Sequence, residues 1–544
     1  MTDLQTWLSP FGIDAPAIKV KDVKADSREV TPGDVFVATK GVNQNGEIFI
    51  DSAIANGASA VLVDSAAAGV VESAAAGVVQ SAAAGVVQSD QEGRTNVIGV
   101  ENLSDVLPKL LAAFYRGSNR IKKIGITGTN GKTTISQLIA QLGDQVKQQV
   151  SVIGTLGVGR LDNLVDINNT TPGLANNYRL LDQFALDGSV FVAMEVSSQG
   201  LAQGRVSGIA FDCTVFTNLT QDHLDYHGTL EHYAQAKKDL FDSNSSATTV
   251  VNIDDATGLQ WFEQWQDDRN VIAVGAYDEK FSELFTAKKN VKHVMFDEVQ
   301  YTPQGLAFTL RSSWGQAVVY CPLFGHFNLT NLVSAMAVLL SFDVKLADLV
   351  GAVKQIRAVP GRMEQFAADP LSTGQVIAVV DYAHSPDALG QALQALKWHV
   401  KGQLWCIFGC GGDRDKSKRP LMAKMAELHA DNIVITNDNP RYEAPEQIID
   451  DIKAGLSNPD GVSIELDRKQ AIATTLMKAK AGDIVLIAGK GHETYQHFGD
   501  EVIDYDERAF VRECCLSLHT HALATHALEK NSNKNSTMSE ETAS

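Results

Sequence analysis

The segment whose residue types best fit a chemical task is 127–134, TGTNGKTT, which separates an apolar run at 123–127 from a helical pattern. Glycines let backbone N–H groups turn toward phosphate oxygens, and the start of a helix adds partial positive charge. Lys132 could then reach the β- and γ-phosphates of a nucleotide, and Thr133 could hold Mg²⁺. Position 126, where a strict Walker A motif begins with glycine, is Ile, so a glycine-rich turn without a ligand is the alternative.

Two further candidates follow apolar runs. Glu195 comes after 190–194, and His223 lies in the segment that follows 213–216. A carboxylate at a neighbouring strand end lies where the Mg²⁺ of a bound nucleotide needs an oxygen ligand. A surface glutamate and a structural histidine remain the alternatives for these two residues.

The elements that must position these residues alternate between strands and helices. The predicted strands are 123–127, 152–155, 190–194, 213–216 and 249–253. After the first strand, apolar residues recur at helical spacing: Ile135, Leu138, Ile139, Leu142 and Val146. Continuous apolar strands separated by helices predict an α/β fold with a parallel sheet covered on both faces.

A later block repeats this pattern, with four apolar runs that each end in a polar or glycine-rich cluster. The runs are 376–380, 404–408, 433–435 and 484–488, and their clusters are DYAHSPD (381–387), GCGGDRD (409–415), NDNPR (437–441) and GKGHE (489–493). Open α/β sheets bind ligands outside the carboxyl ends of their strands. We therefore expect the four clusters to form one composite site.

The chain is too long for one core and is predicted to divide at about residues 100 and 358. The first block, 1–100, includes the turn TPGD before a predicted strand at 35–38, and three copies of an eight-residue unit at 65–88 that we interpret as a loop or helix extension without a function. The blocks 101–358 and 359–516 follow. The polar stretch 517–544 is predicted to be a disordered tail.

Composition excludes several classes of protein. The formal net charge of −19 argues against nucleic-acid binding, because phosphate backbones favour clustered Lys and Arg. The first residues lack the pattern of a signal peptide, and no apolar run has the length of a membrane helix, so a cytoplasmic location is expected. Six cysteines follow no disulfide or zinc spacing, and packing is the expected role of Cys406 and Cys410.

Taken together and in order, six motifs resemble those of the Mur ligases. They are GTNGKT (128–133), MEVSSQGL (194–201), TNLTQDHLDYHG (217–228), GHFNLTN (325–331), PGRME (360–364) and DYAHSPD (381–387). The clusters GCGGDRD, DNPR and GKGHE look like those of the members that add the third amino acid of the peptide. The sequence departs from the family pattern at Gln199 and Ser385.

The resemblance implies three α/β domains and an activity, and a monomer is expected. The domains are a smaller mixed α/β one that binds a UDP-linked substrate, a central parallel-sheet P-loop ATPase and a Rossmann-like C-terminal domain that binds the incoming amino acid. The D-Glu carboxylate of UDP-N-acetylmuramoyl-L-Ala-D-Glu attacks the γ-phosphate of ATP, and the amine of meso-2,6-diaminopimelate displaces phosphate from the acyl phosphate. Mg²⁺ and Lys132 offset the negative charge.

The resemblance also assigns roles to residues. It implies that Thr133, Glu195, His223 and Lys237 bind metal, and that Lys237 is carbamylated by CO₂. The expected catalytic residues are Lys132, Lys237, His223 and Glu195. The expected ATP-binding residues are Gly128, Thr129, Asn130, Gly131, Lys132, Thr133, Thr134, Asn328, Asn331, Arg362 and Asp381. The expected contacts of the UDP-linked substrate are Ala25, Ser27, Val42, Asn43, Gln44, Asn169, Thr170, Thr171, Ser197, Gln203 and Arg205.

The site for the incoming amino acid combines the resemblance with residue chemistry. Diaminopimelate carries a carboxylate and an ammonium at its far end, where lysine has only the ammonium. Arg441 offers a two-pronged donor for that carboxylate, Arg414 can act in the same way, and Glu493 can accept the ammonium. The expected residues are Arg414, Asp438, Asn439, Pro440, Arg441, Gly489 and Glu493. Relatives that add lysine lack the arginine of DNPR.

Two alternatives remain. The nearer one is a ligase of the same family that adds lysine or D-Ala-D-Ala, or a folylpolyglutamate synthase. The more distant one is a nucleotide-binding switch without ligase activity. A GTP switch would need an N-K-x-D element to read guanine, and the sequence has none.

Overall fold

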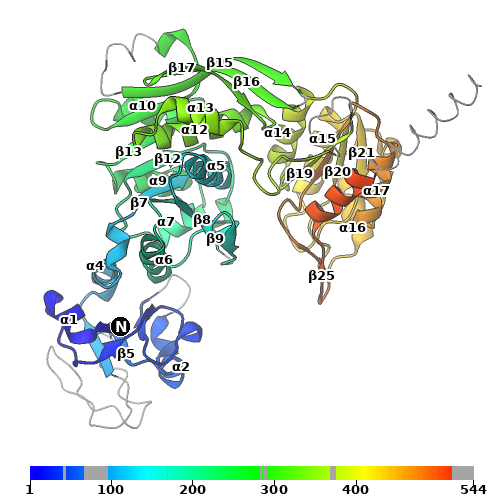
Figure 1. Cartoon of the computed structure of the whole chain (residues 1–544). Coiled ribbons are helices and arrows are strands. Elements are labelled where there is room, and N and C mark those ends of the chain that lie inside the picture. Colours follow the sequence, from blue (N-terminus) through cyan, green and yellow to red (C-terminus); the bar gives the residue numbers. More distant parts are fainter. Residues whose placement is uncertain are drawn as a thin grey trace, which may run out of the picture. The chain divides into compact units, whose positions relative to one another are not determined.

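A computed structural model describes residues 1–40, 45–65, 96–167, 169–281, 285, 288, 291–302, 304–367 and 375–517. Two compact units result (Figure 1): one holds Met1–Val294 and Ser334–Val344, the other Met295–Val333 and Lys345–Ser544. Almost all of the 65–88 repeat and nearly all of the predicted tail lie outside the described residues. The predicted division at residues 100 and 358 stays a prediction.

The start of the first unit forms a small parallel sheet, whose strands lie in the order β3-β4-β5-β6. Their bounds are Val23–Lys24, Val35–Ala38, Ala60–Asp64 and Asn96–Val100. All four residues of β4 are buried, as the apolar run at 35–38 predicted. Helix α2 (Ile50–Ala55) packs Ile50 and Ala53 into the same core. A two-stranded sheet of β1 (Thr2–Asp3) and β2 (Lys19–Val20) and the helices α1 (Leu4–Leu8) and α4 (Leu103–Phe114) complete this part.

The rest of the first unit is built on a larger sheet with the strand order β10-β9-β8-β11-β7-β12-β13-β14. The bounds are β7 Lys122–Thr127, β8 Val150–Gly154, β9 Gly157–Arg160, β10 Asn163–Val165, β11 Phe191–Glu195, β12 Cys213–Phe216, β13 Thr248–Asn252 and β14 Val271–Ala276. The pairs from β8 to β14 are parallel, and β9 and β10 add an antiparallel edge. The predicted parallel sheet is confirmed.

Helices follow these strands as the apolar spacing predicted. Helix α5 (Lys132–Gln145) buries Ile135, Leu138, Ile139 and Leu142, but it ends before Val146, which is its C-cap. The others are α6 Leu174–Leu186, α7 Ser198–Ala202, α8 Leu224–His227, α9 Leu230–Asp242 and α10 Ala256–Trp265. Side-chain caps define several starts, since Thr229 accepts a hydrogen bond from the backbone of α9 and Asp255 from that of α10.

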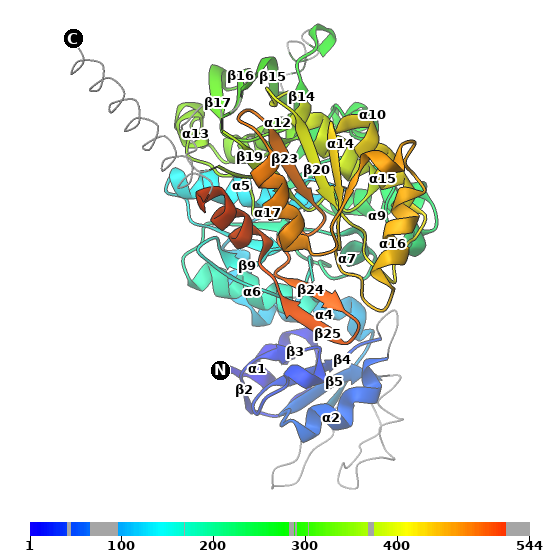
Figure 2. The same cartoon turned by 90° about the vertical axis from the view of Figure 1, so that its right-hand side faces the viewer.

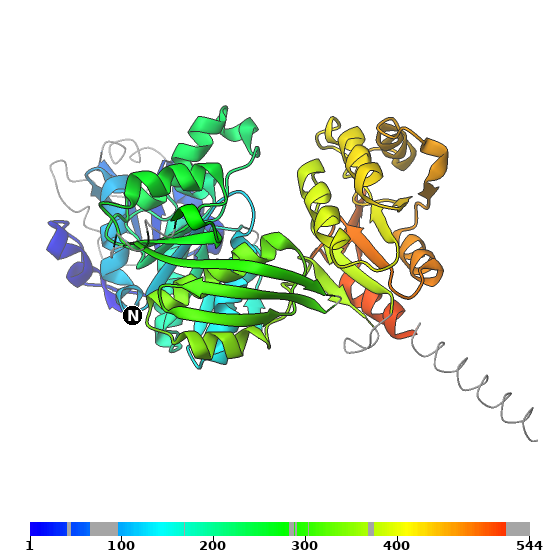
Figure 3. The same ribbon diagram turned by 90° about the horizontal axis from the view of Figure 1, so that it is seen from above.

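The second unit begins with long antiparallel strands that the sequence analysis did not predict. Strands β15 (Val291–Thr302), β16 (Gly305–Ser312) and β17 (Gly315–Cys321) are neighbours in that order, and Figure 3 shows them in green, side by side. Helices α12 (His326–Ser341) and α13 (Leu346–Val353) follow. The boundary between the two units falls within β15 and α12.

A six-stranded sheet with the order β18-β19-β23-β20-β21-β22 forms the rest of the second unit. The strands are β18 Glu364–Phe366, β19 Ile377–Asp381, β20 Leu404–Phe408, β21 Asn432–Ile435, β22 Ser463–Ile464 and β23 Ile484–Ala488. All neighbouring pairs are parallel except β18-β19. The carboxyl ends of β19, β23, β20 and β21 therefore share one edge, which confirms that the four polar clusters follow strands on the same side.

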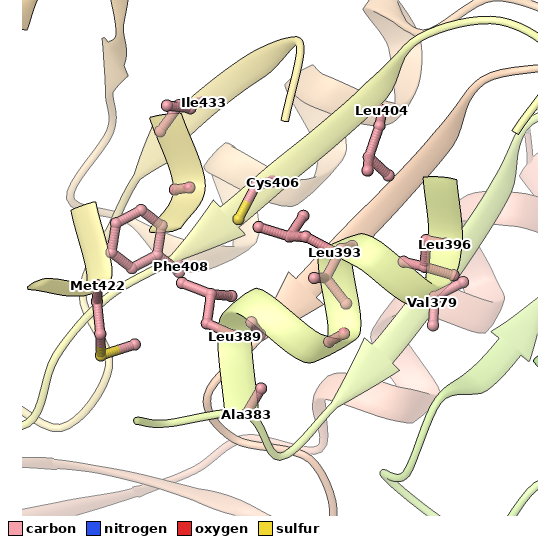
Figure 4. Close-up of a cluster of buried hydrophobic side chains, with 14 of the residues drawn as sticks. Val379, Ala383, Leu389, Leu393, Leu396, Leu404, Cys406, Phe408, Met422 and Ile433 are labelled. Atoms are coloured by element: carbon pink, nitrogen blue, oxygen red, sulfur yellow. The ribbon is translucent and has the colours of Figure 1, made fainter. Parts of the chain in front are cut away.

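Helices cover both faces of this sheet. The cluster on one face involves α14 (Pro386–Lys397), α15 (Lys418–His429) and α16 (Pro445–Lys453), and α17 (Arg468–Lys478) lies on the other face (Figure 2). Figure 4 shows Cys406 among Leu393 and Phe408 in the first cluster, and Cys410 belongs to the same core. The expected packing role of these cysteines is confirmed. Among the described helices, none is both long and apolar enough to cross a membrane.

A buried ion pair connects the face of the sheet that α17 covers to the edge where the four polar clusters lie. The side chains of Arg468 and Glu507 are both 0% exposed and form a two-pronged pair, and Tyr505 donates to the same carboxylate at 3.0 Å. The remaining guanidinium N–H groups donate to the carbonyl oxygens of Asn437 (3.2 Å) and Ala488 (3.0 Å). Arg468 thus ties together the backbone that follows β21 and the end of β23.

We expect Arg468→Met to lower the free energy of unfolding by about 3–5 kcal/mol, because Glu507 would remain buried without its partner. The measurement is chemical denaturation of the second unit's transition. Lys469→Met, a change at the exposed neighbour on the same helix, is the matched control and should alter stability little. A loss below about 1 kcal/mol, the range of an exposed pair, would contradict the prediction.

Candidate active site

The glycine-rich loop lies between the end of β7 and the start of α5. Gly128 and Gly131 have φ angles of 150° and 88°, which glycine adopts readily. A Cβ on Gly128 would lie 1.8 Å from the hydroxyl oxygen of Thr217, so no larger residue fits. Lys132 folds back over the loop, and its Nζ donates to the carbonyl oxygens of Gly128 and Thr129, both at 2.8 Å. This local structure is that of a phosphate-binding loop.

The segment after β12 braces this loop, a role that the sequence analysis missed. Thr217 Oγ1 donates to the carbonyl oxygen of Asn130 at 2.6 Å. Asn218 accepts from the backbone N–H of Asn130 through its side chain (2.9 Å) and from that of Thr129 through its carbonyl oxygen (2.8 Å). The available signal was that TNLT directly follows a strand, but β12 became a neighbour of β7 only through the sheet order.

Glu195 lies at the end of β11 with its carboxylate next to the loop. Its oxygens accept from Thr133 Oγ1 (2.8 Å), Thr155 Oγ1 (3.0 Å) and Thr155 N (2.9 Å). The side chain is buried, and this burial raises the pKa of Glu195 despite the hydrogen bonds and the nearby charge of Lys132. The predicted pair of Thr133 and Glu195 is therefore brought together. Thr155, which follows β8, was missed because β8 becomes a neighbour of β11 only through the strand order of the sheet.

The oxygen atoms of Glu195 and Thr133 are suitable ligands for Mg²⁺. Among the described residues, no group of three or more His, Cys, Asp and Glu side chains could hold a metal by itself. Mg²⁺ is usually bound through one or two protein oxygens together with water and substrate phosphates. The carboxylate of Glu195 and the hydroxyl of Thr133 supply such oxygens beside the phosphate loop.

Lys237 projects from α9 toward the same loop. Its side chain is buried, and Nζ donates to the carbonyl oxygen of Gly128 at 2.8 Å and lies 4.1 Å from the centre of the Tyr233 ring. Burial, reinforced by the charge of Lys132, holds the pKa of Lys237 well below its ordinary value. His223, by contrast, is exposed at the start of α8, where it faces Asp222 at 3.6 Å.

The residues predicted to bind the UDP-linked substrate lie in several places. Thr171 Oγ1 donates to the carbonyl oxygen of Glu195 (2.9 Å) and to Ser197 Oγ (3.2 Å). Arg205 donates to the carbonyl oxygen of Thr171 (2.8 Å) and to Gln203 Oε1 (2.9 and 2.6 Å). These four residues form one connected cluster beside the metal-binding candidates.

The other predicted contacts of this substrate are more scattered. Thr170 Oγ1 lies 3.0 Å from Thr155 Oγ1, and Asn169 is exposed. In the small N-terminal sheet region, Ala25 is exposed and Ser27 is buried at the start of a 3₁₀ turn. The predicted contacts Val42, Asn43 and Gln44 lie outside the described residues.

The second unit holds the other predicted ATP-binding residues. Asn328 and Asn331 lie on the first turns of α12, where Asn331 donates to Asn328 Oδ1 at 3.2 Å. The guanidinium of Arg362 lies 4.6 Å from the centre of the Tyr382 ring. Asp381, at the end of β19, accepts from the backbone N–H groups of Met363 (2.7 Å) and Ala383 (2.8 Å). Arg362 and Asp381 thus lie in adjoining segments.

The DNPR segment after β21 is held by a hairpin that the sequence analysis did not predict, β24 (Tyr495–Phe498) and β25 (Glu501–Asp504). The backbone N–H of Arg441 donates to His497 O at 2.9 Å. Arg441 has a φ angle of 54°, and its guanidinium donates to Gly412 O at 2.8 Å. Arg441 therefore links the hairpin to the GCGGDRD loop, where Arg414 is exposed.

The GKGHE segment lies against DNPR, within hydrogen-bonding distance. Asn439 Nδ2 donates to Glu493 Oε2 at 3.0 Å, and Lys490 Nζ donates to the same oxygen at 3.0 Å. A Cβ on Gly489 would lie 2.7 Å from Asp438 Oδ2, so the two segments pack closely. Pro440 is buried between its neighbours. The predicted residues of both segments are brought together, and Lys490 was missed.

This protein belongs to the class of P-loop nucleotide-binding α/β proteins, because it combines a phosphate loop with an adjacent carboxylate and a parallel sheet. Three family models match it: "Mur ligase family, catalytic domain" at 19–115, "Mur ligase middle domain" at 126–339 and "Mur ligase, glutamate ligase domain" at 361–491.

Two named proteins and one solved structure are similar to this chain over most of its length. UDP-N-acetylmuramoyl-L-alanyl-D-glutamate–2,6-diaminopimelate ligase of Haemophilus influenzae is 41% identical over 492 residues, which cover 90% of this chain and 95% of that protein. The protein of the same name from Vibrio cholerae is 41% identical over 92% of this chain and 95% of its own length. A solved structure of a ligase with this name has a TM-score of 0.66 at 35% identity and covers 95% of this chain and 99% of its own. The chain belongs to the Mur ligase family of ATP-dependent amide-bond ligases.

Proposed function

We propose that this protein joins meso-2,6-diaminopimelate to the D-Glu residue of UDP-N-acetylmuramoyl-L-Ala-D-Glu at the expense of ATP, in the synthesis of peptidoglycan precursors. The observation that carries the proposal is the 41% identity to ligases of that name over 95% of their length. Because ATP and a UDP-linked precursor would be its substrates, we further propose a cytoplasmic enzyme.

The residues around the phosphate loop support the first half of this reaction. Backbone N–H groups of the loop and the ammonium of Lys132 would bind the phosphates of ATP. Glu195 and Thr133 would hold Mg²⁺, which offsets the charge that repels a carboxylate nucleophile from a phosphate. Thr171, Ser197 and Arg205 would orient the peptide end of the UDP-linked substrate, since they adjoin Glu195. The product of this half would be an acyl phosphate on D-Glu.

The second half needs the amine of the incoming amino acid held close to that acyl phosphate. We assign the recognition of its far end to Arg441 and Glu493. The guanidinium of Arg441 matches a carboxylate, and the carboxylate of Glu493 matches an ammonium. A substrate with both groups at its far end fits this pair better than lysine, which would leave Arg441 without an anion.

We expect Arg441→Ala to raise the KM for diaminopimelate, because removing one partner of a desolvated charge pair costs about 2–5 kcal/mol, roughly 30-fold or more. The KM values for ATP and the UDP-linked dipeptide should stay nearly constant, since Arg441 is assigned to neither. The mutant need not gain lysine activity. Arg512→Ala, an exposed arginine of the same unit, is the matched control.

The decisive test of the function is a substrate panel that measures ADP release with the UDP-linked dipeptide and diaminopimelate, lysine or D-Ala-D-Ala. The expected result is a kcat/KM for diaminopimelate far above that for lysine. A ratio near one would contradict the specificity assigned to Arg441, even if amide-bond formation itself were observed.

A further inference from the structure

Lys490 is a fully buried ammonium that the proposed reaction has not used. Its side chain is 0% exposed, and a buried charge is costly unless it is paired and hydrogen-bonded. Nζ donates to Asn439 Oδ1 and Glu493 Oε2, both at 3.0 Å, and lies 3.6 Å from Asp438 Oδ1. The cation is thus surrounded by the residues expected to receive the incoming amino acid, without itself being accessible to a substrate.

The hydrogen bonds around Lys490 form a closed ring of three. Lys490 donates to Asn439 and to Glu493, and Asn439 Nδ2 donates at 3.0 Å to the same oxygen of Glu493. Asn439 Oδ1 also accepts from the backbone N–H of His497 at 3.1 Å. The ring therefore joins DNPR, GKGHE and the β24-β25 hairpin, and it fixes the direction of the Glu493 carboxylate.

Only one oxygen of that carboxylate is used by the ring. Glu493 Oε2 accepts both bonds, and no hydrogen bond within the described part of the chain engages Oε1. The Glu493 side chain is 19% exposed, against 9% for Asp438 and 0% for Lys490. Two carboxylates share one ammonium, and Oε1 is the Glu493 oxygen that the ring leaves for another donor.

We propose that Lys490 is a positioning residue for substrate choice. Its buried ammonium holds Glu493 so that Oε1 receives the ammonium at the far end of the incoming amino acid. This inference rests on the proposed function and adds to it a residue that acts through Glu493. Without the ammonium, the carboxylates of Asp438 and Glu493 would lose the cation that both face, and the ring of hydrogen bonds that directs Glu493 would open.

The test compares Lys490→Met, of similar length without the charge, with the wild type in the ADP-release assay. We expect the KM for diaminopimelate to rise by roughly 30-fold or more, the range seen when one partner of a buried charge pair is removed. The KM values for ATP and the UDP-linked dipeptide should change less than about twofold. Lys478→Met, at an exposed lysine of the same unit, is the matched control.

A double-mutant cycle separates positioning from a general structural role. If Lys490 acts through Glu493, adding Lys490→Met to Glu493→Gln should raise the KM for diaminopimelate little further. Multiplicative effects, or a parallel rise of all three KM values, would overturn the proposal. Lys490→Gln, which keeps a donor for Asn439, should reproduce the KM rise. Failure of both Lys490 variants to fold would assign the residue to the fold alone and also overturn it.

The double-mutant cycle is informative only if the enzyme uses diaminopimelate. Different results would therefore contradict the proposed function and the proposed role of Lys490. A wild type that releases no ADP with diaminopimelate contradicts the proposed function. A wild type that does so, combined with an unchanged KM in Lys490→Met, contradicts only the role of Lys490.

Discussion

Lys132→Ala is expected to lower kcat for ADP release by on the order of a hundredfold to a thousandfold or more, the cost of removing a charge that stabilises a transition state. The reason is electrostatic, because the ammonium at the start of α5 would offset the growing negative charge as a carboxylate attacks the γ-phosphate. In the present structure this ammonium donates to the carbonyl oxygens of Gly128 and Thr129, directly over the phosphate loop.

The fold should survive this change. Lys132 is only partly buried, and it donates hydrogen bonds to the backbone of its own loop. The control is Lys122→Ala on the same strand–loop segment, whose side chain is 56% exposed and pairs with Asp212 on the surface. Equal melting temperatures with unequal kcat values would support the prediction. A Lys132→Ala enzyme with wild-type kcat would place the phosphate site elsewhere.

Lys237→Ala is expected to be nearly inactive. We propose that the neutral amine of Lys237 attacks the carbon of CO₂ and loses a proton, giving a carbamate whose oxygens would be available to bind Mg²⁺. Burial, reinforced by the charge of Lys132, lowers the pKa of Lys237, so the neutral amine that this reaction needs is populated at a lower pH than for an exposed lysine. Carbamylation should therefore persist to a lower pH than at an exposed lysine, and be lost as pH falls below this lowered pKa.

Two measurements check this prediction. Small carboxylic acids such as formate should partly restore Lys237→Ala, because they supply the missing oxygens. The wild type equilibrated with ¹³C-labelled bicarbonate should show a carbamate carbon in its NMR spectrum, absent from the variant. Lys238→Ala is the control, since the neighbouring ammonium pairs with Asp242 on the surface. An unmodified Lys237 in a fully active enzyme would refute carbamylation.

Much of the architecture could be predicted from local patterns alone. Apolar runs located β4, β12, β20 and β23 at their observed bounds, because a strand buried on both faces requires an unbroken apolar segment. The phosphate loop was equally local, since glycines at 128 and 131 and the following helix define its geometry within a few residues. The parallel sheet then implied that polar clusters at strand ends share one edge.

Contacts between distant segments could not be predicted in this way. The pairing of Thr155 with Glu195 and the support of the loop by Asn218 depend on the strand order, which no local pattern encodes. The antiparallel strands β15 to β17 also escaped prediction. They alternate buried and exposed residues over parts of their length rather than forming continuous apolar runs.

The predicted site for the incoming amino acid shows most clearly what the sequence could indicate and what depended on the tertiary structure. The residue types of DNPR and GKGHE, together with the family resemblance, were enough to propose Arg441 and Glu493 as the ends of a zwitterion-binding site. Only the tertiary structure decided that Lys490 is buried and that a hairpin at 495–504 holds Arg441. The physical reason is that burial and hydrogen bonding of a charged side chain depend on what packs over it. For Lys490, Glu493 is a local partner, but Asp438 and Asn439 come from DNPR, which precedes it in the chain by some fifty residues.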